Sequence, residues 1–387
     1  MDENNANNFS VEQEIEVNFN NTKCPNCGNN LKFNPETQKL YCEYCDSEIG
    51  FEQDSNYQEI SLNNAIGVNQ TWDSTAKVYI CENCNAKIVL SKGETASLCP
   101  FCGTAHVISS DELPGVKPNV VVPFMISNSK ATDNLKAWAK RKLFAPSDFK
   151  KKISPNDLKG VYMPCYTFDS NTYSTYEGRI GVRHTRTVGS GKNRRTETYI
   201  VWHHIHGVYE HFFDDVTISA SERFTQKQIS SLGGYSAQNN KVYEDKFLLG
   251  YMAYSSDKAV EPCWNEAKGV IDGNLRRLIL SQYHYDVVSY LNVSTTHSNV
   301  TYKYVMVPVY IGSYKYGKKM YGFMTNGVTG KTKGKAPVSP WRVLVAVLLG
   351  IGLIIGTYFI ATASGCLEEA STIAKDAVNL LSNNIII

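Results

Sequence analysis

The longest apolar stretch of the chain covers residues 343–363, which contain no charged side chain. A helix of this length crosses the hydrocarbon core of a bilayer, which is about 30 Å thick. The pattern therefore predicts one transmembrane helix, and the alternative is the buried core helix of a soluble domain. Apolar residues at helical spacing in the tail, residues 364–387, predict a short helix at the outer membrane surface.

Residues 118–335 show mixed helical and strand periodicity, and the order of the elements occurs twice. The predicted elements are a strand at 120–126, a helix at 129–143 and a strand at 161–166, then a strand at 247–254, a helix at 258–282 and a strand at 305–310. Pro164 and Pro308 lie inside corresponding strands, which predicts an edge or a bulge, because proline has no N–H to donate. The predicted fold class is α+β, with an internally duplicated domain.

Eight of the 11 cysteines form four C-x-x-C pairs. The first two pairs are separated by fourteen residues, and so are the last two. This spacing predicts two tetrahedral Zn²⁺ sites in two zinc ribbons, at residues 22–50 and 77–107, joined by a linker at 51–76. The predicted ligands are Cys24, Cys27, Cys42 and Cys45 in the first ribbon and Cys81, Cys84, Cys99 and Cys102 in the second.

The residue after each second cysteine supports the zinc interpretation. Gly28, Asp46, Asn85 and Gly103 occupy these places, and all tolerate the left-handed backbone of a zinc knuckle. Such small ribbons depend on the metal for folding, with on the order of 10 kcal/mol of binding free energy. Four thiolates leave no open coordination position, so both ions are predicted to be structural rather than catalytic.

The cysteine spacing, the N-terminal composition and the charges on either side of the apolar run predict that most of the chain lies inside the cell. Cysteines spaced for metal binding favour a reducing compartment. The first 21 residues are Asn-rich and acidic, which predicts a disordered leader rather than a signal sequence. Basic residues precede the apolar run and acidic residues follow it, so the positive-inside rule predicts a single-pass protein of the cell membrane with its N-terminal bulk in the cytoplasm. These residues are Lys331, Lys333, Lys335 and Arg342 before the run, and Glu368 and Glu369 after it.

No catalytic motif is complete, so the sequence predicts a protein that is not an enzyme. The glycine-rich segments around Lys192 and Lys331 lack the pattern of a phosphate loop. Cys165 and Cys263 lie in apolar or helical context, which is typical of core thiols. A histidine cluster has two open interpretations. It is either a second metal site or a solvated strand face on which His204 and His206 lie beside Trp202. The cluster consists of His203, His204, His206 and His211.

Basic residues concentrate in two places although the net charge is only +2. One is the segment 130–159, and the other is a hairpin with Arg183, Arg186, Lys192, Arg194 and Arg195. Either can face anionic lipid, and either can be an ordinary solvated surface. Both ribbons mix lysines with acidic residues, which makes nucleic-acid binding the weaker interpretation, because phosphate binding needs clustered Lys and Arg.

Several segments resemble a bacterial family of membrane-linked zinc-ribbon proteins with two ribbons of the transcription-factor-IIB type. The segments are VVPF at 121–124, KGVYMP at 159–164, VPVY at 307–310 and TNGVTGK at 325–331. Members are often automatically labelled primosomal helicase or replisome organiser, but this chain has no helicase phosphate loop.

The resemblance implies a scaffold or adaptor that recruits protein partners to the cytoplasmic membrane face, in the setting of membrane stress. Some members are encoded beside flotillin-like or phage-shock-type proteins, which are the partners the resemblance suggests. The alternative function is a membrane-tethered nucleic-acid-binding regulator.

Overall fold

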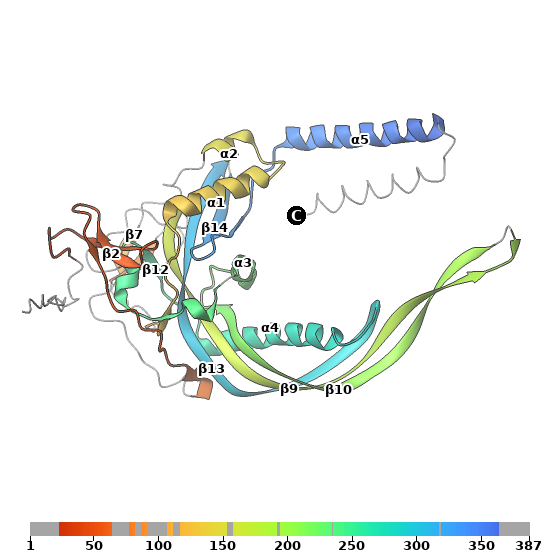
Figure 1. The fold of residues 1–387 in the computed structure, drawn as a ribbon, viewed down its shortest axis with the longest axis horizontal. Helices are drawn as coiled ribbons and strands as arrows, with labels where there is room; N and C mark the ends of the chain where they lie inside the picture. Colours follow the sequence, from red (N-terminus) through yellow and green to blue (C-terminus); the bar gives the residue numbers. More distant parts are fainter. Residues whose placement is uncertain are drawn as a thin grey trace, which may run out of the picture.

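Three long antiparallel strands dominate the protein, whose computed structural model describes residues 23–63, 77–81, 87–90, 107–110, 117–152, 158–191, 194–233, 235–316 and 319–363. They are β9 (Leu158–Val188), β10 (Arg195–Ser219) and β13 (Val287–Tyr316). β9 lies between the other two and pairs with both. Beyond the body of the protein, the strands continue as a curved arm that ends at the β9–β10 turn (Figure 1).

One face of the arm carries a core. Along residues 171–178, β9 alternates exposed and buried side chains, as expected for a sheet covered on one side. Tyr176 and Ile180 pack with Leu291 of β13 and with Ile279 of α4 (Val260–Leu280). Helix α4 lies in the hollow of the curved sheet (Figure 1) and buries a row of residues at helical spacing, namely Cys263, Ala267, Ile271, Leu275 and Ile279. The helix predicted at 258–282 is confirmed, with slightly shorter ends.

The described strands form a twelve-stranded sheet and a separate three-stranded sheet. The large sheet runs in the order β11-β8-β13-β9-β12-β6-β5-β7, with β10 beside β9, β14 and β4 beside β13, and β15 beside β14. Its short strands are β4 (Ile60–Ser61), β5 (Lys77–Cys81), β6 (Lys87–Leu90), β7 (Val107–Ser110), β8 (Val120–Val121), β11 (Lys241–Val242), β12 (Met252–Tyr254), β14 (Lys319–Asn326) and β15 (Thr332–Gly334). The other helices are α1 (Asn128–Arg141), α2 (Ser147–Lys152), α3 (Gln226–Leu232) and α5 (Pro340–Ala363), with 3₁₀ turns η4 (Ala237–Asn239) and η5 (Asp245–Leu248). The protein is thus a mixed α+β protein with a curled sheet.

Pro164 and Pro308 lie in central strands, and neither is at a register shift, so the predicted edge or bulge is wrong. Each proline lies where the strand changes its outer neighbour, from β12 to β10 beside Pro164 and from β8 to β14 beside Pro308. The Pro164 carbonyl accepts from the Ala220 N–H (3.1 Å) and the Pro308 carbonyl from the Gly327 N–H (2.9 Å), both on this outer side. The nitrogen of each proline also points to this outer side. No N–H is needed there, because the strand has no ladder hydrogen bond to form where one partner strand ends and the next begins.

Two predicted strands are shorter than expected. Of residues 120–126, only β8 is a strand, and the Val122 N–H adds one hydrogen bond to the Met306 carbonyl (2.9 Å). The pairing stops there because Pro123 has no N–H and the Phe124 N–H meets the Tyr162 hydroxyl instead (3.4 Å). Of residues 247–254, η5 takes the first part and β12 the last, and Gly250 lies between them with a φ of +84° that interrupts an extended strand. The helix predicted at 129–143 is confirmed as α1, which the Ser127 side chain caps.

Residues 51–63, the described part of the predicted linker, lie against the body. The ring of Phe51 is 6.2 Å from that of Phe33 and 5.2 Å from that of Phe247. Strand β4 pairs with β13 through Ser61 and Ile60. The connection out of the first ribbon is therefore a packed segment rather than a free spacer.

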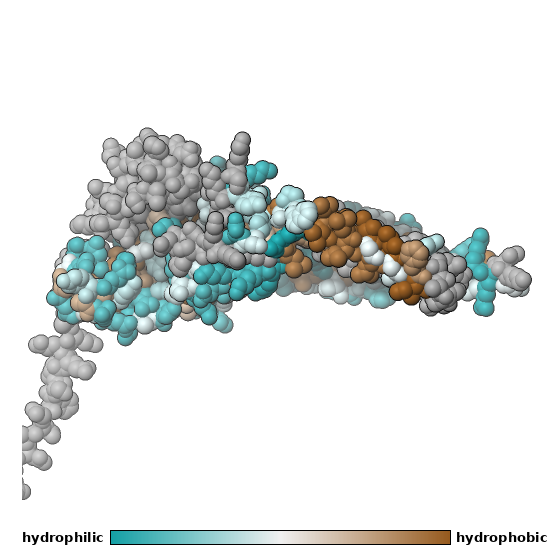
Figure 2. Space-filling view, turned by 90° about the horizontal axis from the view of Figure 1, so that it is seen from above, coloured by the Kyte–Doolittle hydropathy of each residue, from teal (hydrophilic) through white to brown (hydrophobic). Residues whose placement is uncertain are grey.

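Helix α5 is long and apolar enough to cross a membrane. None of its most apolar window is buried inside the protein. Figure 2 shows the helix as a continuous hydrophobic band beside a mostly hydrophilic body. The predicted leader and the predicted outer tail lie outside the described residues.

Candidate metal site and its surroundings

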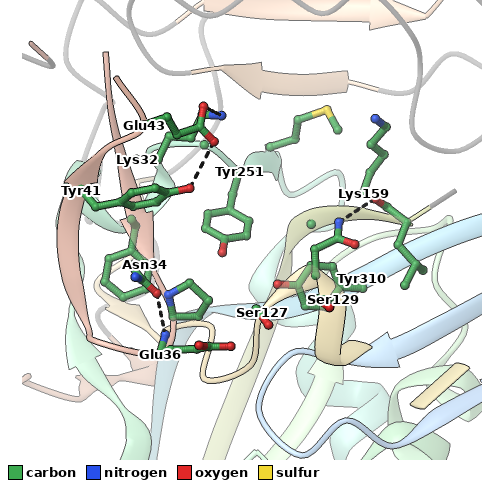
Figure 3. Close-up of a pocket in the computed structure, with 17 residues that line it drawn as sticks. Lys32, Asn34, Glu36, Tyr41, Glu43, Ser127, Ser129, Lys159, Tyr251 and Tyr310 are labelled. Atoms are coloured by element: carbon green, nitrogen blue, oxygen red, sulfur yellow. Dashed lines mark hydrogen bonds and ion pairs between the residues drawn. The ribbon is translucent and has the colours of Figure 1, made fainter. Parts of the chain in front are cut away.

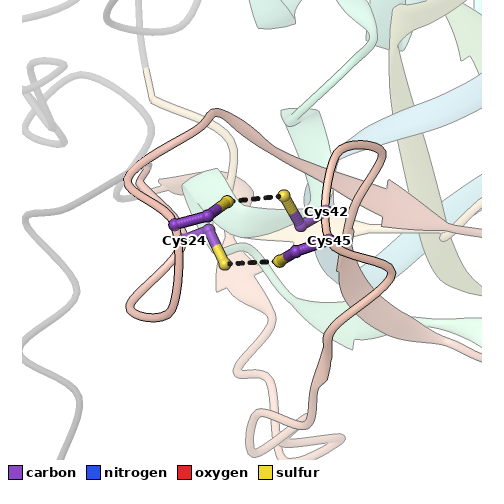
Figure 4. A group of neighbouring side chains, drawn as sticks. Cys24, Cys42 and Cys45 are labelled. Carbon is purple, nitrogen blue, oxygen red and sulfur yellow. Dashed lines mark hydrogen bonds between the residues drawn. The ribbon is translucent and has the colours of Figure 1, made fainter.

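Four cysteine thiols converge beside the three-stranded sheet of β1 (Leu31–Asn34), β2 (Lys39–Cys42) and β3 (Glu48–Ile49). Sγ of Cys24 lies 3.5 Å from that of Cys45, and Sγ of Cys27 lies 3.4 Å from that of Cys42 (Figure 4). All four sulfur atoms lie within 4.8 Å of one another. An ion with tetrahedral metal–sulfur bonds of about 2.3 Å holds its ligands about 3.8 Å apart. The thiols therefore fit a single metal ion.

The backbone around the thiols forms the two predicted turns. The Gly28 N–H donates to the Cys24 carbonyl (2.8 Å), and the Asp46 N–H donates to the Cys42 carbonyl (3.0 Å). Gly28 has a φ of +73° and Asp46 a φ of +56°, so the left-handed backbone predicted after each second cysteine is confirmed in this ribbon. Each turn places the two cysteines of a pair on the same side of the site.

Hydrogen bonds to the sulfur of Cys45 favour its thiolate form. The Ser47 side chain lies 3.1 Å from Cys45 Sγ, and the Ser47 N–H also donates to this sulfur. These hydrogen bonds lower the pKa of the Cys45 thiol to about 6. A thiolate is the form that binds a metal, so the surroundings of Cys45 are suited to coordination.

The structure describes only part of the second predicted site. Cys81 ends β5, but its side chain lies outside the described residues, as do Cys84, Cys99 and Cys102. The described strands β5, β6 and β7 extend the large sheet, because β6 pairs with β12. Whether these four cysteines meet stays a prediction.

The first ribbon is joined firmly to the large sheet. The Phe33 N–H donates to the Leu249 carbonyl (2.9 Å), and the Gln38 side chain donates to the Phe124 carbonyl (2.8 Å). Cys24 and Cys42 belong to the same buried cluster as Phe247. A disturbance of the cysteine site is therefore expected to reach the body as well as the ribbon.

A cleft of about 720 Å³ separates the ribbon from the sheet (Figure 3). The ribbon side carries Lys32, which forms an ion pair with Glu43 (2.6 Å). The opposite side carries Tyr251, Tyr310 and the start of α1. Gly160 leaves room for Tyr251, since a Cβ there would lie 2.5 Å from its ring. Acidic and basic side chains balance in this cleft, which gives it no preference for one sign of charge.

A buried lysine, not identified from the sequence, links three strands of the body. Lys303 of β13 is 2% exposed, and its Nζ lies 2.7 Å from Asp215, 3.0 Å from Glu59 and 3.4 Å from Asp169. Burial alone would lower the pKa of Lys303, but the neighbouring carboxylates hold it above its ordinary value. Asp169, Asp214 and Asp215 are close enough to bind a cation, and the Lys303 ammonium already supplies one there. In the sequence, the feature that indicates this buried cluster is a single lysine inside the apolar run at 302–311.

Asp169 gives this cluster a pH dependence. Burial raises its pKa from 3.8 to about 6. A raised carboxyl pKa contributes stability that is complete below pH 3.8 and is lost as the pH rises through 6. Between pH 5 and pH 7, the free energy of unfolding of the wild type is therefore expected to fall by about 1 kcal/mol more than that of the Asp169→Asn variant, which lacks this titrating group. Urea unfolding of both proteins at the two pH values measures this, and parallel pH profiles would contradict it.

The histidine cluster does not assemble a metal site among the described residues. His204 and His206 lie on the same face of β10 as Trp202, as alternation predicts, while the buried neighbour Ile205 lies on the other face. All four histidines are exposed. His211 stacks on Tyr209 and lies edge-on to Phe213. In the described part of the chain, the side-chain groups that could hold a metal are the four cysteines and the three aspartates.

The basic hairpin tip is partly neutralised. Glu197 forms ion pairs with Arg195 (2.8 Å) and Arg186 (3.2 Å). The Arg186 guanidinium also lies 5.7 Å from the centre of the Tyr199 ring. Lys192 lies outside the described residues. The tip is thus weaker as an anion-binding surface than its sequence suggests.

Comparison with known proteins finds a relative that matches over most of its length. The chain is 29% identical over 323 residues to the uncharacterized protein YdjG of Bacillus subtilis (strain 168). The match covers 83% of this chain and 91% of that protein. No protein-family model matches the chain. No solved structure matches it either.

Proposed function

We propose that this protein is a membrane-anchored scaffold whose zinc ribbons recruit protein partners to the cytoplasmic face of the cell membrane. Helix α5 carries the proposal, because a helix of this length and apolarity, with none of its most apolar window buried, needs lipid around it. The basic residues before α5 favour a cytoplasmic body. A scaffold needs no reaction, and no catalytic group enters the proposal.

Zinc is the metal we propose for the cysteine site. Four thiolates in tetrahedral arrangement suit Zn²⁺, and a closed shell of four protein ligands is typical of a structural ion. We extend this to Cys81, Cys84, Cys99 and Cys102 on the identical spacing of the two units. Two structural zinc ions per chain would then hold two ribbons against the large sheet.

The exposed side of the first ribbon suits a protein partner better than a nucleic acid. Tyr44 lies between the two ligands Cys42 and Cys45 and is 78% exposed, and exposed tyrosines are frequent anchors of protein interfaces. Lys32 pairs with Glu43, and Lys39 pairs with Glu48 (3.4 Å). Lysines with acidic partners release few counterions from a phosphate backbone, so the nucleic-acid alternative finds no support in this ribbon.

Insertion of α5 also constrains its direction. Figure 1 shows α5 and the curved arm projecting from the body on the same side. A bilayer around α5 would enclose the arm, whose tip carries Arg183, Arg186, Arg194 and Arg195. Charged side chains are costly inside a bilayer. We therefore infer that the inserted helix turns away from the arm about its own start, at the junction between Ser339 and Pro340.

The family resemblance adds a setting to the scaffold. Membership in the membrane-linked zinc-ribbon family would favour partners of the phage-shock or flotillin-like kind and a role in membrane stress. An internal duplication is part of the same proposal. Its support is the order β8-α1-α2-β9-β10, which matches β12-α4-β13-β14 apart from the additional helix α2, with Pro164 and Pro308 at corresponding places.

The test is affinity purification of the full-length protein from detergent-solubilised membranes. The wild type is expected to retain partners that are lost when Cys24 and Cys81 are both replaced by serine. Tyr44→Ala separates docking from folding, because it leaves the predicted zinc ligands intact and is expected to weaken partner capture roughly tenfold or more. Tyr199→Ala, an exposed tyrosine on the arm, is the matched control. Unchanged partners in the double cysteine variant would refute the proposal.

A further inference from the structure

The connection between α1 and α2 forms an exposed corner with a strongly basic surface. Helix α1 ends with Lys140 and Arg141 in its last turn, and Lys142 caps it. Leu143 follows and is 76% exposed. The Lys142 ammonium lies 5.2 Å from the centre of the Trp138 ring, which keeps its charge close to the helix. We call residues 140–143 the basic corner.

The basic corner is attached to the first turn of α5. The Ser339 N–H donates to the Phe144 carbonyl (2.8 Å), directly after the corner. The Arg342 guanidinium donates to the Leu143 carbonyl (3.2 Å) and to the Ser147 hydroxyl (2.7 Å). Figure 1 shows α1 and α2 beside the start of α5. The corner therefore lies next to the point where the apolar helix begins.

The Arg342 hydrogen bonds move with α5, but one contact that holds the corner beside the start of the helix does not. The hydrogen bond between Ser339 and Phe144 precedes the helix, so it persists when the helix turns about its start. Trp341, in the first turn, is 70% exposed, and tryptophan is enriched at membrane interfaces. An inserted α5 thus brings the corner to the level of the lipid headgroups.

We propose that the basic corner binds anionic lipid headgroups of the leaflet into which α5 inserts. The inference rests on the proposed membrane anchor and specifies the lipid that the anchored body contacts. Arg141 and Lys142 directly precede Leu143, whose carbonyl accepts from Arg342, so these three cations outnumber Asp148, the acidic residue in the first turn of α2, even without counting Lys140. The excess of positive charge favours an anionic surface, and the exposed Leu143 side chain can enter the interfacial region.

The test uses the full-length protein reconstituted in vesicles of phosphatidylcholine that contain about one third phosphatidylglycerol. Trace amounts of a photoactivatable phosphatidylglycerol or phosphatidylcholine are added, and mass spectrometry measures lipid attached to the peptide containing residues 140–143. The anionic probe is expected to label this peptide several-fold more than the neutral probe. Lys140→Glu with Lys142→Glu is expected to lower this labelling roughly tenfold.

Lys159→Glu with Lys227→Glu makes the same change in net charge away from the corner and is expected to preserve labelling. Equal labelling by both probes, or labelling unaffected by the corner variant, would overturn the inference and leave an acidic protein as the partner of the corner. Alkaline carbonate extraction of the same vesicles separates the two proposals. An absence of labelling in a protein that resists extraction overturns only the lipid contact, whereas release by carbonate refutes the anchor as well.

Discussion

Replacement of Lys303 by methionine is expected to lower the free energy of unfolding by about 3–5 kcal/mol. The buried ammonium forms ion pairs with Asp169, Asp215 and Glu59, which lie on three different segments. Methionine fills the space of the aliphatic stem but leaves these carboxylates without their cation. An uncompensated buried charge costs much more than the net contribution of the intact ion pairs. Urea unfolding followed by circular dichroism measures the loss.

Lys227→Met is the matched control, because Lys227 is an exposed residue of α3. It is expected to change the unfolding free energy by less than about 0.5 kcal/mol. Adding Asp169→Asn to Lys303→Met is expected to restore part of the lost stability, since one buried charge disappears. A Lys303→Met protein as stable as the control would show that the cluster is not the electrostatic centre described above.

Replacement of Cys45 by serine is expected to remove one bound metal ion per chain and to unfold the first ribbon. Four-thiolate coordination contributes on the order of 10 kcal/mol to the folding of such a ribbon, and three thiolates bind much more weakly. Cys45 is exposed, so the substitution disturbs the site without opening a cavity in the core. Elemental analysis measures the metal, and limited proteolysis within residues 23–50 is expected to accelerate roughly tenfold or more.

Tyr44→Ala is the control for this experiment, because the residue neighbours the ligand but its side chain is solvent-exposed. It is expected to retain the full metal content and the slow proteolysis of the wild type. A Cys45→Ser protein with unchanged metal content would exclude coordination by these four thiols.

The features that the sequence revealed depend on local spacing. The turns of the first ribbon follow from Cys-x-x-Cys pairs followed by Gly28 and Asp46, whose backbone conformation needs few distant contacts. Helices α1 and α4 follow from apolar residues at helical intervals, and α5 follows from length and apolarity. In each case, nearby residues determine the structure.

The features that the sequence did not reveal depend on contacts between distant segments. Lys303 meets Glu59 across 244 positions of sequence and Asp169 across 134, and no local pattern encodes such a meeting. The edge or bulge predicted at Pro164 and Pro308 is wrong for the same reason. Each proline lies where its strand changes partner, and this change is a property of the whole sheet that no local pattern shows. The attachment of the first ribbon to η5 has the same origin, since Phe33 and Phe247 approach only in the folded chain.

The most direct test of recruitment is crosslinking in native membranes followed by mass spectrometry of the captured proteins. Wild type, Cys24→Ser with Cys81→Ser, and the control Lys227→Met are compared at equal amounts in the membrane fraction. A set of protein partners that crosslinks to the wild type and the control, but is lost from the cysteine variant, is the predicted result. The same crosslinked proteins in all three samples would contradict recruitment through the ribbons.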